Sequence, residues 1–253
     1  MPIQWMNSLS RHERLNRFNP ITAFIHVPKT AGSTVNSYLQ QSGTAGVAHV
    51  EALFKQPDKV KSAIARYRWV SGHVTFPKMR ATLSKASRRK VRYFTAIRSP
   101  DKQIMSHLNW LIEIYHKGGK FYDNHPPAVK RISERIRTSD TSDPRVIVEL
   151  LNSAQGLFLN CQSRFVLGPD RGNLSHDEMA QRLEVYEMIG TEGTLPLLIE
   201  RISGIEYQDS ERKNVSPYHF PAEVFRDSFV VDYLRERNAA DEALYEYVKS
   251  NDC

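Results

Sequence analysis

The segment His26–Thr34 (HVPKTAGST) contains residue types that bind an anion. It starts within a short apolar run, Ile21–Val27, which predicts a buried strand that stops at Pro28. It leads into a helix expected at Ser33–Gln41. The N–H groups of such a loop and of the following helix N-terminus favour a bound negative charge. Because Lys29 adds a full positive charge, the segment predicts an anion-binding loop.

Hydroxyl groups and a glycine complete this loop. We expect Thr30, Ser33 and Thr34 to supply hydroxyl donors, and Gly32 to let the backbone approach a ligand closely or adopt a positive φ. The loop is not a Walker A motif, because GxxxxGK[ST] places Lys directly before Ser/Thr, whereas here Lys29 comes first. A kinase or NTPase is therefore the weaker interpretation. A strand–turn–helix that holds these residues by chance is the remaining alternative.

Nine histidines provide candidates for a general base. A side chain whose pKa is near neutrality suits the removal of a proton from an attacking hydroxyl. His73 follows the strand predicted at Tyr67–Ser71, so we expect it at the same sheet edge as Lys29. A buried histidine that caps the turn is the alternative for His73. His26 is expected as a packed residue of the first strand, and His107 either touches substrate or is solvent-exposed.

The string FIHVPKTAGST resembles the phosphosulfate-binding loop of sulfotransferases that use 3′-phosphoadenosine 5′-phosphosulfate (PAPS). The similarity is greatest to the heparan sulfate 2-O- and 6-O-sulfotransferases and their bacterial relatives. It implies a P-loop-like sulfotransferase fold and PAPS as co-substrate, with no metal. It also implies that the 5′-phosphosulfate is bound by Lys29, Thr30, Ala31, Gly32, Ser33 and Thr34.

A second element of this family follows the strand VRYFTAI. The enzymes bind the 3′-phosphate of the donor with an Arg that ends a strand and a Ser eight residues later. Arg98 and Ser106 have this spacing here. A guanidinium can hold a phosphate bidentately and a hydroxyl adds one hydrogen bond. Since eight helical residues span roughly 12 Å, joint contact requires Arg98 to reach across; an exposed helix serine is the alternative.

Three further segments resemble the family more loosely. The Gly-His pair at His73 resembles the segment that carries the base in the 2-O- and 6-O-type enzymes, whereas a carboxylate base of the 3-O type leaves His49 and Glu51 as rivals. ERKNVS resembles a late basic loop that closes over PAPS, so Arg212 and Lys213 are candidate phosphate contacts or part of a solvated turn. The segment Gln162–Phe165 also resembles a family segment, but its role does not carry over.

The order of the predicted elements indicates one α/β domain with a mainly parallel central sheet flanked by helices. Strands at 67–71, 91–97 and 186–190 alternate with helices at 78–86 and from Ser99-Pro100-Asp101 onward, where Ser is the expected N-cap. The second half looks more helical, with a capping box at Ser175 and Glu178 and two terminal helices that break near Asn238. Trp69 and Trp110 are expected in the core, with stacking on a sugar as the alternative. We expect an N-terminal extension at 1–20, a PAPS-binding core at 21–116, a mobile loop at 117–143, and a helical part that shapes the acceptor site at 144–253.

The charge of the chain is divided unevenly. The net charge is +7, but residues 1–126 hold 20 Lys+Arg against 6 Asp+Glu, whereas residues 127–253 hold 15 against 22. A basic half indicates an anionic partner: nucleic acid, an acidic membrane surface or a phosphorylated ligand. PAPS accounts for part of the excess without nucleic acid. Four basic residues outside the motifs remain for an anionic acceptor or for solvent: Lys85, Arg88, Arg89 and Lys90.

Composition and motifs leave three classes of protein. The first is a PAPS-dependent O-sulfotransferase that acts on a glycan or glycolipid hydroxyl and releases adenosine 3′,5′-bisphosphate (PAP). The others are a kinase with a phosphate-binding loop and a non-catalytic polyanion-binding protein. No apolar run has the roughly 18 residues that a membrane span needs, which leaves peripheral membrane contact open. The two cysteines do not suggest a disulfide scaffold, so we expect a cytoplasmic protein. The resemblance to the bacterial sulfotransferases implies a bacterial one.

Overall fold

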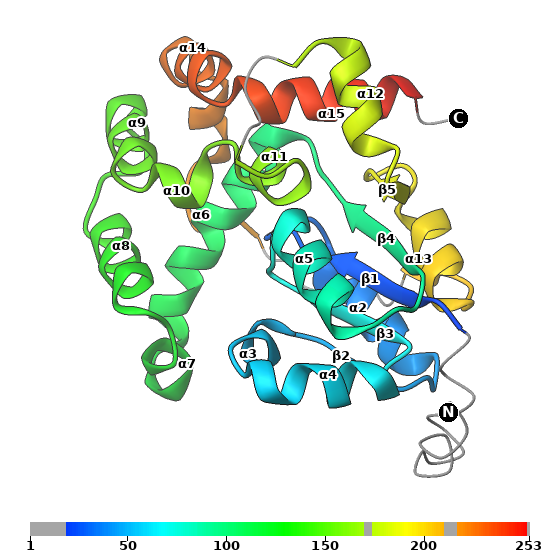
Figure 1. Cartoon of the computed structure of the whole chain (residues 1–253). Helices are drawn as coiled ribbons and strands as arrows, with labels where there is room; N and C mark the ends of the chain where they lie inside the picture. Colours follow the sequence, from blue (N-terminus) through cyan, green and yellow to red (C-terminus); the bar gives the residue numbers. More distant parts are fainter. Residues whose placement is uncertain (1–18, 170–173, 210–216, 252–253) are drawn as a thin grey trace, which may run out of the picture. The chain divides into compact units, whose positions relative to one another are not determined.

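A computed structural model describes residues 19–169, 174–209 and 217–251 (Figure 1). These residues form two compact units. Unit 1 contains residues 19–97, 164–169 and 174–209, and unit 2 contains residues 98–163 and 217–251. Each unit is described by itself below.

A parallel five-stranded sheet forms the centre of unit 1. Its strand order is β2-β3-β1-β4-β5, and every neighbouring pair is parallel. The strands are β1 (Ile21–Ile25), β2 (Gly46–Val47), β3 (Trp69–Gly72), β4 (Val91–Ala96) and β5 (Tyr186–Gly190). The predicted α/β class with a parallel central sheet is confirmed. The sequence analysis missed β2, because two residues show no strand periodicity.

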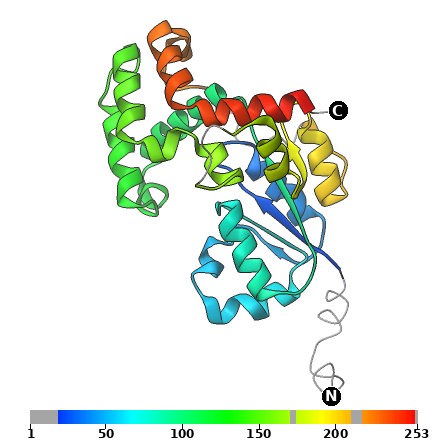
Figure 2. The same cartoon turned by 45° about the horizontal axis from the view of Figure 1, so that its top comes forward.

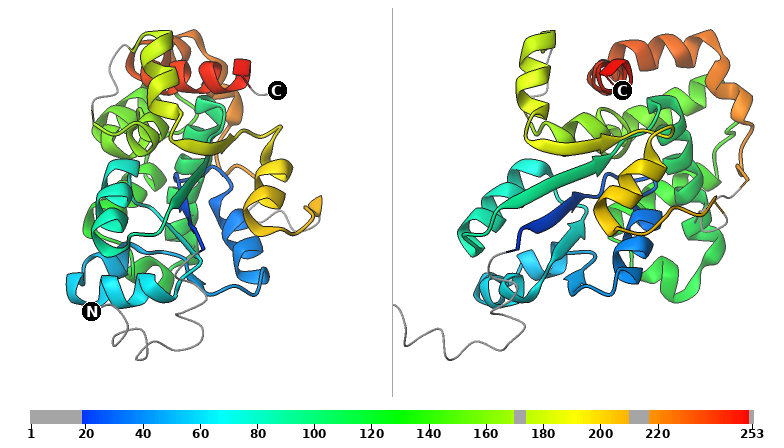
Figure 3. Two further views of the ribbon diagram at one scale, coloured as in Figure 1. Left: turned by 45° about the vertical axis from the view of Figure 1, so that its right-hand side comes forward. Right: turned by 90° about the vertical axis from the view of Figure 1, so that its right-hand side faces the viewer.

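Helices cover both faces of this sheet (Figure 3, left panel). On one face lie α2 (Gly32–Gln41) and α13 (Leu195–Ser203), which pack against Phe24 and Phe94 of the strands. On the other face α5 (Phe76–Ala86) packs against β1 and contacts α4 (Pro57–Arg66). The short α3 (Glu51–Phe54) precedes α4, and α12 (His176–Leu183) precedes β5. The layers bring the carboxyl ends of all strands to one edge, where parallel sheets bind ligands.

Unit 2 is helical. Its helices are α6 (Pro100–Lys117), α7 (Gly119–Asp123), α8 (Pro127–Arg137), α9 (Pro144–Ser153), α10 (Gln155–Phe158), the 3-10 helix η3 (Ala222–Arg226), α14 (Ser228–Arg237) and α15 (Ala239–Asn251). In Figure 2, α9 lies beside α14, and these two helices pack together. Helix α11 (Cys161–Val166) crosses the boundary between the units. None of the helices in the described part of the chain combines the length and hydropathy needed to cross a bilayer.

The expected mobile loop at 117–143 is wrong, because this segment forms α7 and α8. Its prolines lie at or before helix starts, where a missing N–H costs little. Ile132 and Ile136 lie four residues apart, on one helix face, and are buried. The Ser133 hydroxyl donates to the backbone oxygen of Leu111 in α6. A narrow apolar face therefore suffices to order a largely polar segment.

Most other helix predictions are confirmed. The capping box of Ser175 and Glu178 is present, and the two terminal helices are separated at Asn238. Ser99 does precede α6 as its N-cap residue, but its side chain forms no capping bond and instead donates to the Asp101 carboxylate. The Ser99 hydroxyl is therefore not the expected cap.

Candidate functional site

The loop between β1 and α2 has an unusual backbone. Lys29 and Ala31 both have φ of 68°, whereas Thr30 between them and Gly32 after them do not have positive φ. A left-handed conformation costs a non-glycine residue roughly 1–2 kcal/mol, so it needs support from surrounding structure or from function. Such alternation points successive N–H groups into one concavity, which is an anion-binding arrangement. Among the described residues, the N–H groups of Ala31, Gly32 and Ser33 meet no backbone acceptor.

Gly32 is required for a reason that the sequence did not reveal. Its φ is not positive, so the left-handed conformation falls on Lys29 and Ala31 instead. A Cβ atom at Gly32 would overlap the imidazole of His26. The glycine therefore allows the first turn of α2 to lie directly against that ring.

The three hydroxyls of the loop differ in their surroundings. The Thr30 hydroxyl donates to the backbone oxygen of Val27 at 3.0 Å, so its proton stabilises the loop itself. Thr34 is only 1% exposed, whereas Ser33 is exposed at the start of α2. The expectation that all three serve as ligand donors is therefore wrong for the Thr30 proton. Of the three, Ser33 presents its side chain to solvent.

Each of three adjacent strands is followed by a histidine of its own at its carboxyl end. His26 directly follows β1, His73 directly follows β3, and His49 comes two residues after β2. Since the strand order is β2-β3-β1, the three imidazoles gather at one sheet edge. The ring centroids of His26 and His73 are 4.0 Å apart, and those of His49 and His73 are 6.1 Å apart. His26 is buried, as expected, but lies just outside its strand.

The hydrogen bond of His73 fixes its tautomer. Its Nδ1 lies 2.8 Å from the backbone oxygen of His26. A carbonyl oxygen only accepts, so Nδ1 carries the proton. In the neutral ring, Nε2 then holds the lone pair. His73 is exposed, and its Nε2 can act as a base or as a ligand.

Glu51 supports His73 from the start of α3. Its Oε1 accepts a hydrogen bond from the His73 backbone N–H. Its Oε2 is buried and has no hydrogen-bond partner in the described part of the chain. A Cβ atom at Gly72 would lie 2.8 Å from this oxygen, so the carboxylate uses space that only glycine leaves.

Burial dominates the electrostatics of the pair formed by His26 and His73. Burial, followed by the charges of His73, His49 and Lys29, lowers the pKa of His26 well below its ordinary value. Burial also lowers the pKa of His73, while the bond to the His26 carbonyl and the charge of Glu51 partly oppose this. Although neighbouring atoms crowd the His73 ring, the residue keeps exposed surface. Both rings are therefore neutral near pH 7.

Arg98 and Ser106 both lie in unit 2. Gln162 holds the backbone of Arg98 with two bonds: the Arg98 N–H donates to Oε1, and Nε2 donates to the Arg98 oxygen, each at 2.7 Å. This gives Gln162, whose role the sequence left open, a positioning task. Ser106 is half-buried in the second turn of α6. Arg212 and Lys213 lie outside the described residues.

Three other candidates, a histidine and two tryptophans, are buried or partly buried by neighbouring residues. His107 is buried, and its ring lies 5.5 Å from those of Trp110 and Phe158, so the alternative of a solvent-exposed histidine is wrong. Trp69 is buried as expected and donates from Nε1 to the Thr44 oxygen at 3.1 Å. Trp110 is partly buried against the unit 2 core.

The basic residues in the last turn of α5 and in the link to β4 lie at the opposite edge of the sheet. Lys90 precedes β4 directly, so this cluster is at the amino ends of the strands. Lys85, Arg88 and Lys90 are exposed. The Arg89 guanidinium instead donates to four backbone oxygens: those of Asn19, Pro20, Ile64 and Tyr67. Arg89 is therefore structural, and the other three do not reach the histidines.

Sequence reasoning missed the link between His49, Glu51 and His73. The only signal was that two polar residues, His49 and Glu51, precede the Gly-His pair at His73 by about 22–24 residues. Comparison with known proteins adds no assignment to this site: no family model matches the chain, and no curated protein matches it.

Proposed function

We propose that the protein is a PAPS-dependent O-sulfotransferase that transfers a sulfuryl group to a hydroxyl of a glycan or glycolipid. One observation carries the proposal. A loop with positive φ at Lys29 and Ala31, whose next N–H groups meet no backbone acceptor among the described residues, lies at the carboxyl edge of the sheet that carries His73 with Nε2 available. An anion-binding loop and a neutral base at one edge are what sulfuryl transfer from an anionic donor to a hydroxyl needs.

The loop supplies the donor site in this proposal. The N–H groups of Ala31, Gly32 and Ser33 would donate to the 5′-phosphosulfate, and the Lys29 ammonium would neutralise its charge. The resemblance assigns the 3′-phosphate to Arg98 and Ser106. Gln162 would then act as a positioning residue, because it fixes the backbone of Arg98.

The chemical step needs a base and a stabilised leaving group. The acceptor oxygen attacks sulfur in line with the bond between sulfur and the bridging oxygen. As the new O–S bond forms, that S–O bond breaks, and the acceptor proton passes to Nε2 of His73. The bond from His73 Nδ1 to the His26 oxygen orients the ring and stabilises the imidazolium that results. Lys29 stabilises the charge that grows on the departing PAP.

The test is transfer from radiolabelled PAPS to a library of glycan and glycolipid acceptors, run beside γ-labelled ATP. The proposal requires transfer of sulfate, no transfer of phosphate, and competitive inhibition by PAP. Titration calorimetry with PAP measures the donor site without any acceptor. Transfer of phosphate alone would establish a kinase instead. Binding of a polyanion without PAP binding would establish a non-catalytic binding protein.

A further inference from the structure

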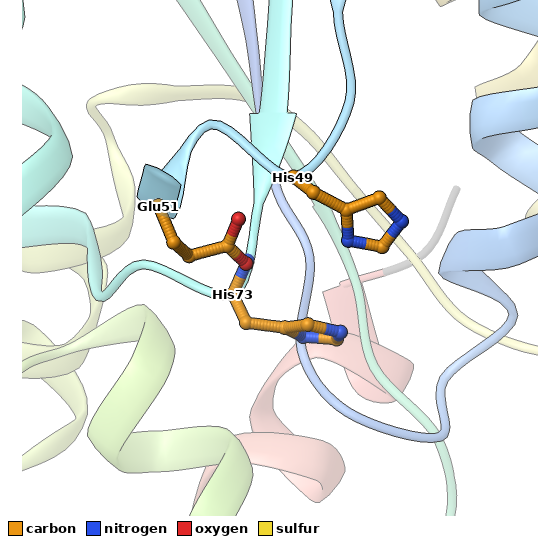
Figure 4. A group of neighbouring side chains, drawn as sticks. All are labelled: His49, Glu51 and His73. Atoms are coloured by element: carbon orange, nitrogen blue, oxygen red, sulfur yellow. The ribbon is translucent and has the colours of Figure 1, made fainter. Parts of the chain in front are cut away.

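We propose that His49, Glu51 and His73 form a binding site for Zn²⁺. The candidate ligand atoms of these three side chains all lie within 4.8 Å of one another. Figure 4 shows the side chains converging from three segments: the loop after β2, the start of α3 and the end of β3. No other group of three or more such residues in the described part of the chain meets this condition.

The ligand set is one that Zn²⁺ uses. Two imidazoles and one carboxylate occupy three of four tetrahedral positions in zinc sites that keep an open position. Soft thiolate ligands are lacking, whereas hard cations such as Mg²⁺ prefer sites made of oxygen. The mixture of two nitrogen ligands and one oxygen ligand therefore favours a borderline cation.

The bond from His73 to His26 prepares the first ligand. Histidines that bind a metal almost always donate their other ring N–H to a carbonyl or carboxylate, which fixes the tautomer. His73 does so already, since Nδ1 lies 2.8 Å from the His26 oxygen. Its Nε2 lone pair therefore needs no tautomer change before it binds the ion.

The carboxylate provides the second ligand. Oε1 of Glu51 is held by the backbone N–H of His73, and Oε2 is buried with no hydrogen-bond partner among the described residues. A buried carboxylate oxygen without a partner is costly, and a bound cation removes that cost. Glu51 thus has one oxygen that positions it and one that is left for the ion.

His49 completes the set with a small movement. In a tetrahedral site two ligands of one Zn²⁺ ion stand about 3.4 Å apart, since zinc–nitrogen and zinc–oxygen bonds are about 2.0–2.2 Å long. The remaining gap closes by rotation of an exposed side chain. His49 is exposed, and its backbone, with φ of 55°, brings its side chain towards the end of β3.

Zinc binding does not depend on the proposed sulfotransferase activity, but one consequence does. An ion on Nε2 of His73 occupies the lone pair that would accept the hydroxyl proton. If the proposed function is correct, Zn²⁺ inhibits transfer.

The test is titration calorimetry of Zn²⁺ into the full, chelator-treated chain without PAPS or acceptor. We expect one ion per chain, and X-ray absorption of the complex should show two imidazoles and oxygen ligands, without sulfur. His49→Ala and Glu51→Gln should each weaken the affinity by at least about 100-fold, since even outer-shell changes cost 10–100-fold. His116→Ala is the control: it removes an imidazole that pairs with His219 in unit 2 and should leave the affinity unchanged.

Three results would overturn the site: no binding tighter than about 1 mM, unchanged affinity in both variants, or a spectrum without imidazole ligands. Glu51→Gln is nearly isosteric, and circular dichroism of both variants checks their fold. The two proposals fail separately. Zinc binding in a chain that transfers no sulfate would leave the site standing and remove the enzyme, whereas absent binding removes the site whatever the activity.

Discussion

The backbone oxygen of His26 lies 2.8 Å from Nδ1 of His73 and thereby decides which nitrogen of His73 can react. The two residues follow adjacent parallel strands, whose register pairs Ile25 with Gly72. The strand register thus positions the carbonyl of one histidine against the ring of the next. A side chain that sequence analysis treats as an isolated candidate is therefore oriented by the sheet itself.

Replacement of His73 tests its role as the base. His73→Gln replaces the imidazole with a polar amide that has no group able to accept a proton at neutral pH. We expect transfer from PAPS to fall by about 10²–10⁴-fold, the usual contribution of a positioned base, while the affinity for PAP changes little. Rate assays and calorimetry on the same preparation measure the two effects. Unchanged turnover in His73→Gln would exclude His73 as the base and leave Glu51 or His49.

Adjacent loop residues provide a matched pair of substitutions. Gly32→Ala should destabilise unit 1 by about 1–3 kcal/mol, because the new methyl group overlaps the His26 ring and forces it to move. Ala31→Gly should be neutral or stabilising, because φ of 68° suits glycine. Urea unfolding measures both changes. In a His26→Ala background Gly32→Ala should cost little further stability, and an equal loss in both backgrounds would show that the ring is not the obstacle.

The sequence was sufficient for four of the five strands of the sheet. Runs of β-branched and apolar residues identified β1, β3, β4 and β5, and the charge and hydroxyl content of 28–34 predicted an anion-binding loop between β1 and α2. These features are local, so they can be found without the fold. The positive φ of Lys29 and Ala31 could not be predicted in this way, since neither lysine nor alanine favours a left-handed backbone conformation.

The histidine cluster depends on contacts between distant segments. His49 and Glu51 meet His73 because the two-residue strand β2 pairs with β3, and a strand this short has no period to detect. Likewise, the sequence alone suggests that Arg89 is one of four basic residues left for an anionic acceptor or for solvent. Only the fold brings the four carbonyl oxygens around its guanidinium.

The ion pair between Arg92 and Glu187 predicts a dependence of stability on pH. Arg92 of β4 donates two hydrogen bonds to the carboxylate of Glu187 in β5, and these bonds hold the pKa of Glu187 below its ordinary value. A carboxyl group whose folded pKa is lowered stabilises the fold above its unfolded pKa of about 4.3, and this stabilisation is lost as the pH falls through the folded pKa. Both side chains are 29% exposed, so the effect at pH 7 is at most about 1 kcal/mol.

Glu187→Gln measures this contribution. The difference in urea unfolding free energy between the natural chain and the variant should be largest near pH 7 and should shrink as the pH falls below about 4.3. Glu184→Gln, which removes an exposed carboxylate two residues before β5, should change stability little at either pH. A difference for Glu187→Gln that stays constant between pH 7 and pH 3 would contradict the ion pair.

Arg89 and Arg88 are neighbours in the sequence with opposite expected effects. The Arg89 guanidinium donates to oxygens that belong to the entry into β1, the last turn of α4 and the residue that caps α4. Burial, with a smaller contribution from the charge of Arg68, lowers its pKa to about 10, so it stays protonated at neutral pH. Arg89→Ala should destabilise the chain by about 2–3 kcal/mol, since hydrogen bonds from a charged donor are lost together. Arg89→Lys should recover only part of this, because an ammonium has three donors in a different geometry.

Arg88→Ala is the control. It removes an exposed charge of the same type and should be neutral within about 0.5 kcal/mol. Thermal and urea unfolding of the three variants measure these effects, and equal losses in Arg88→Ala and Arg89→Ala would mean that the basic cluster acts through its net charge rather than through the backbone contacts of Arg89.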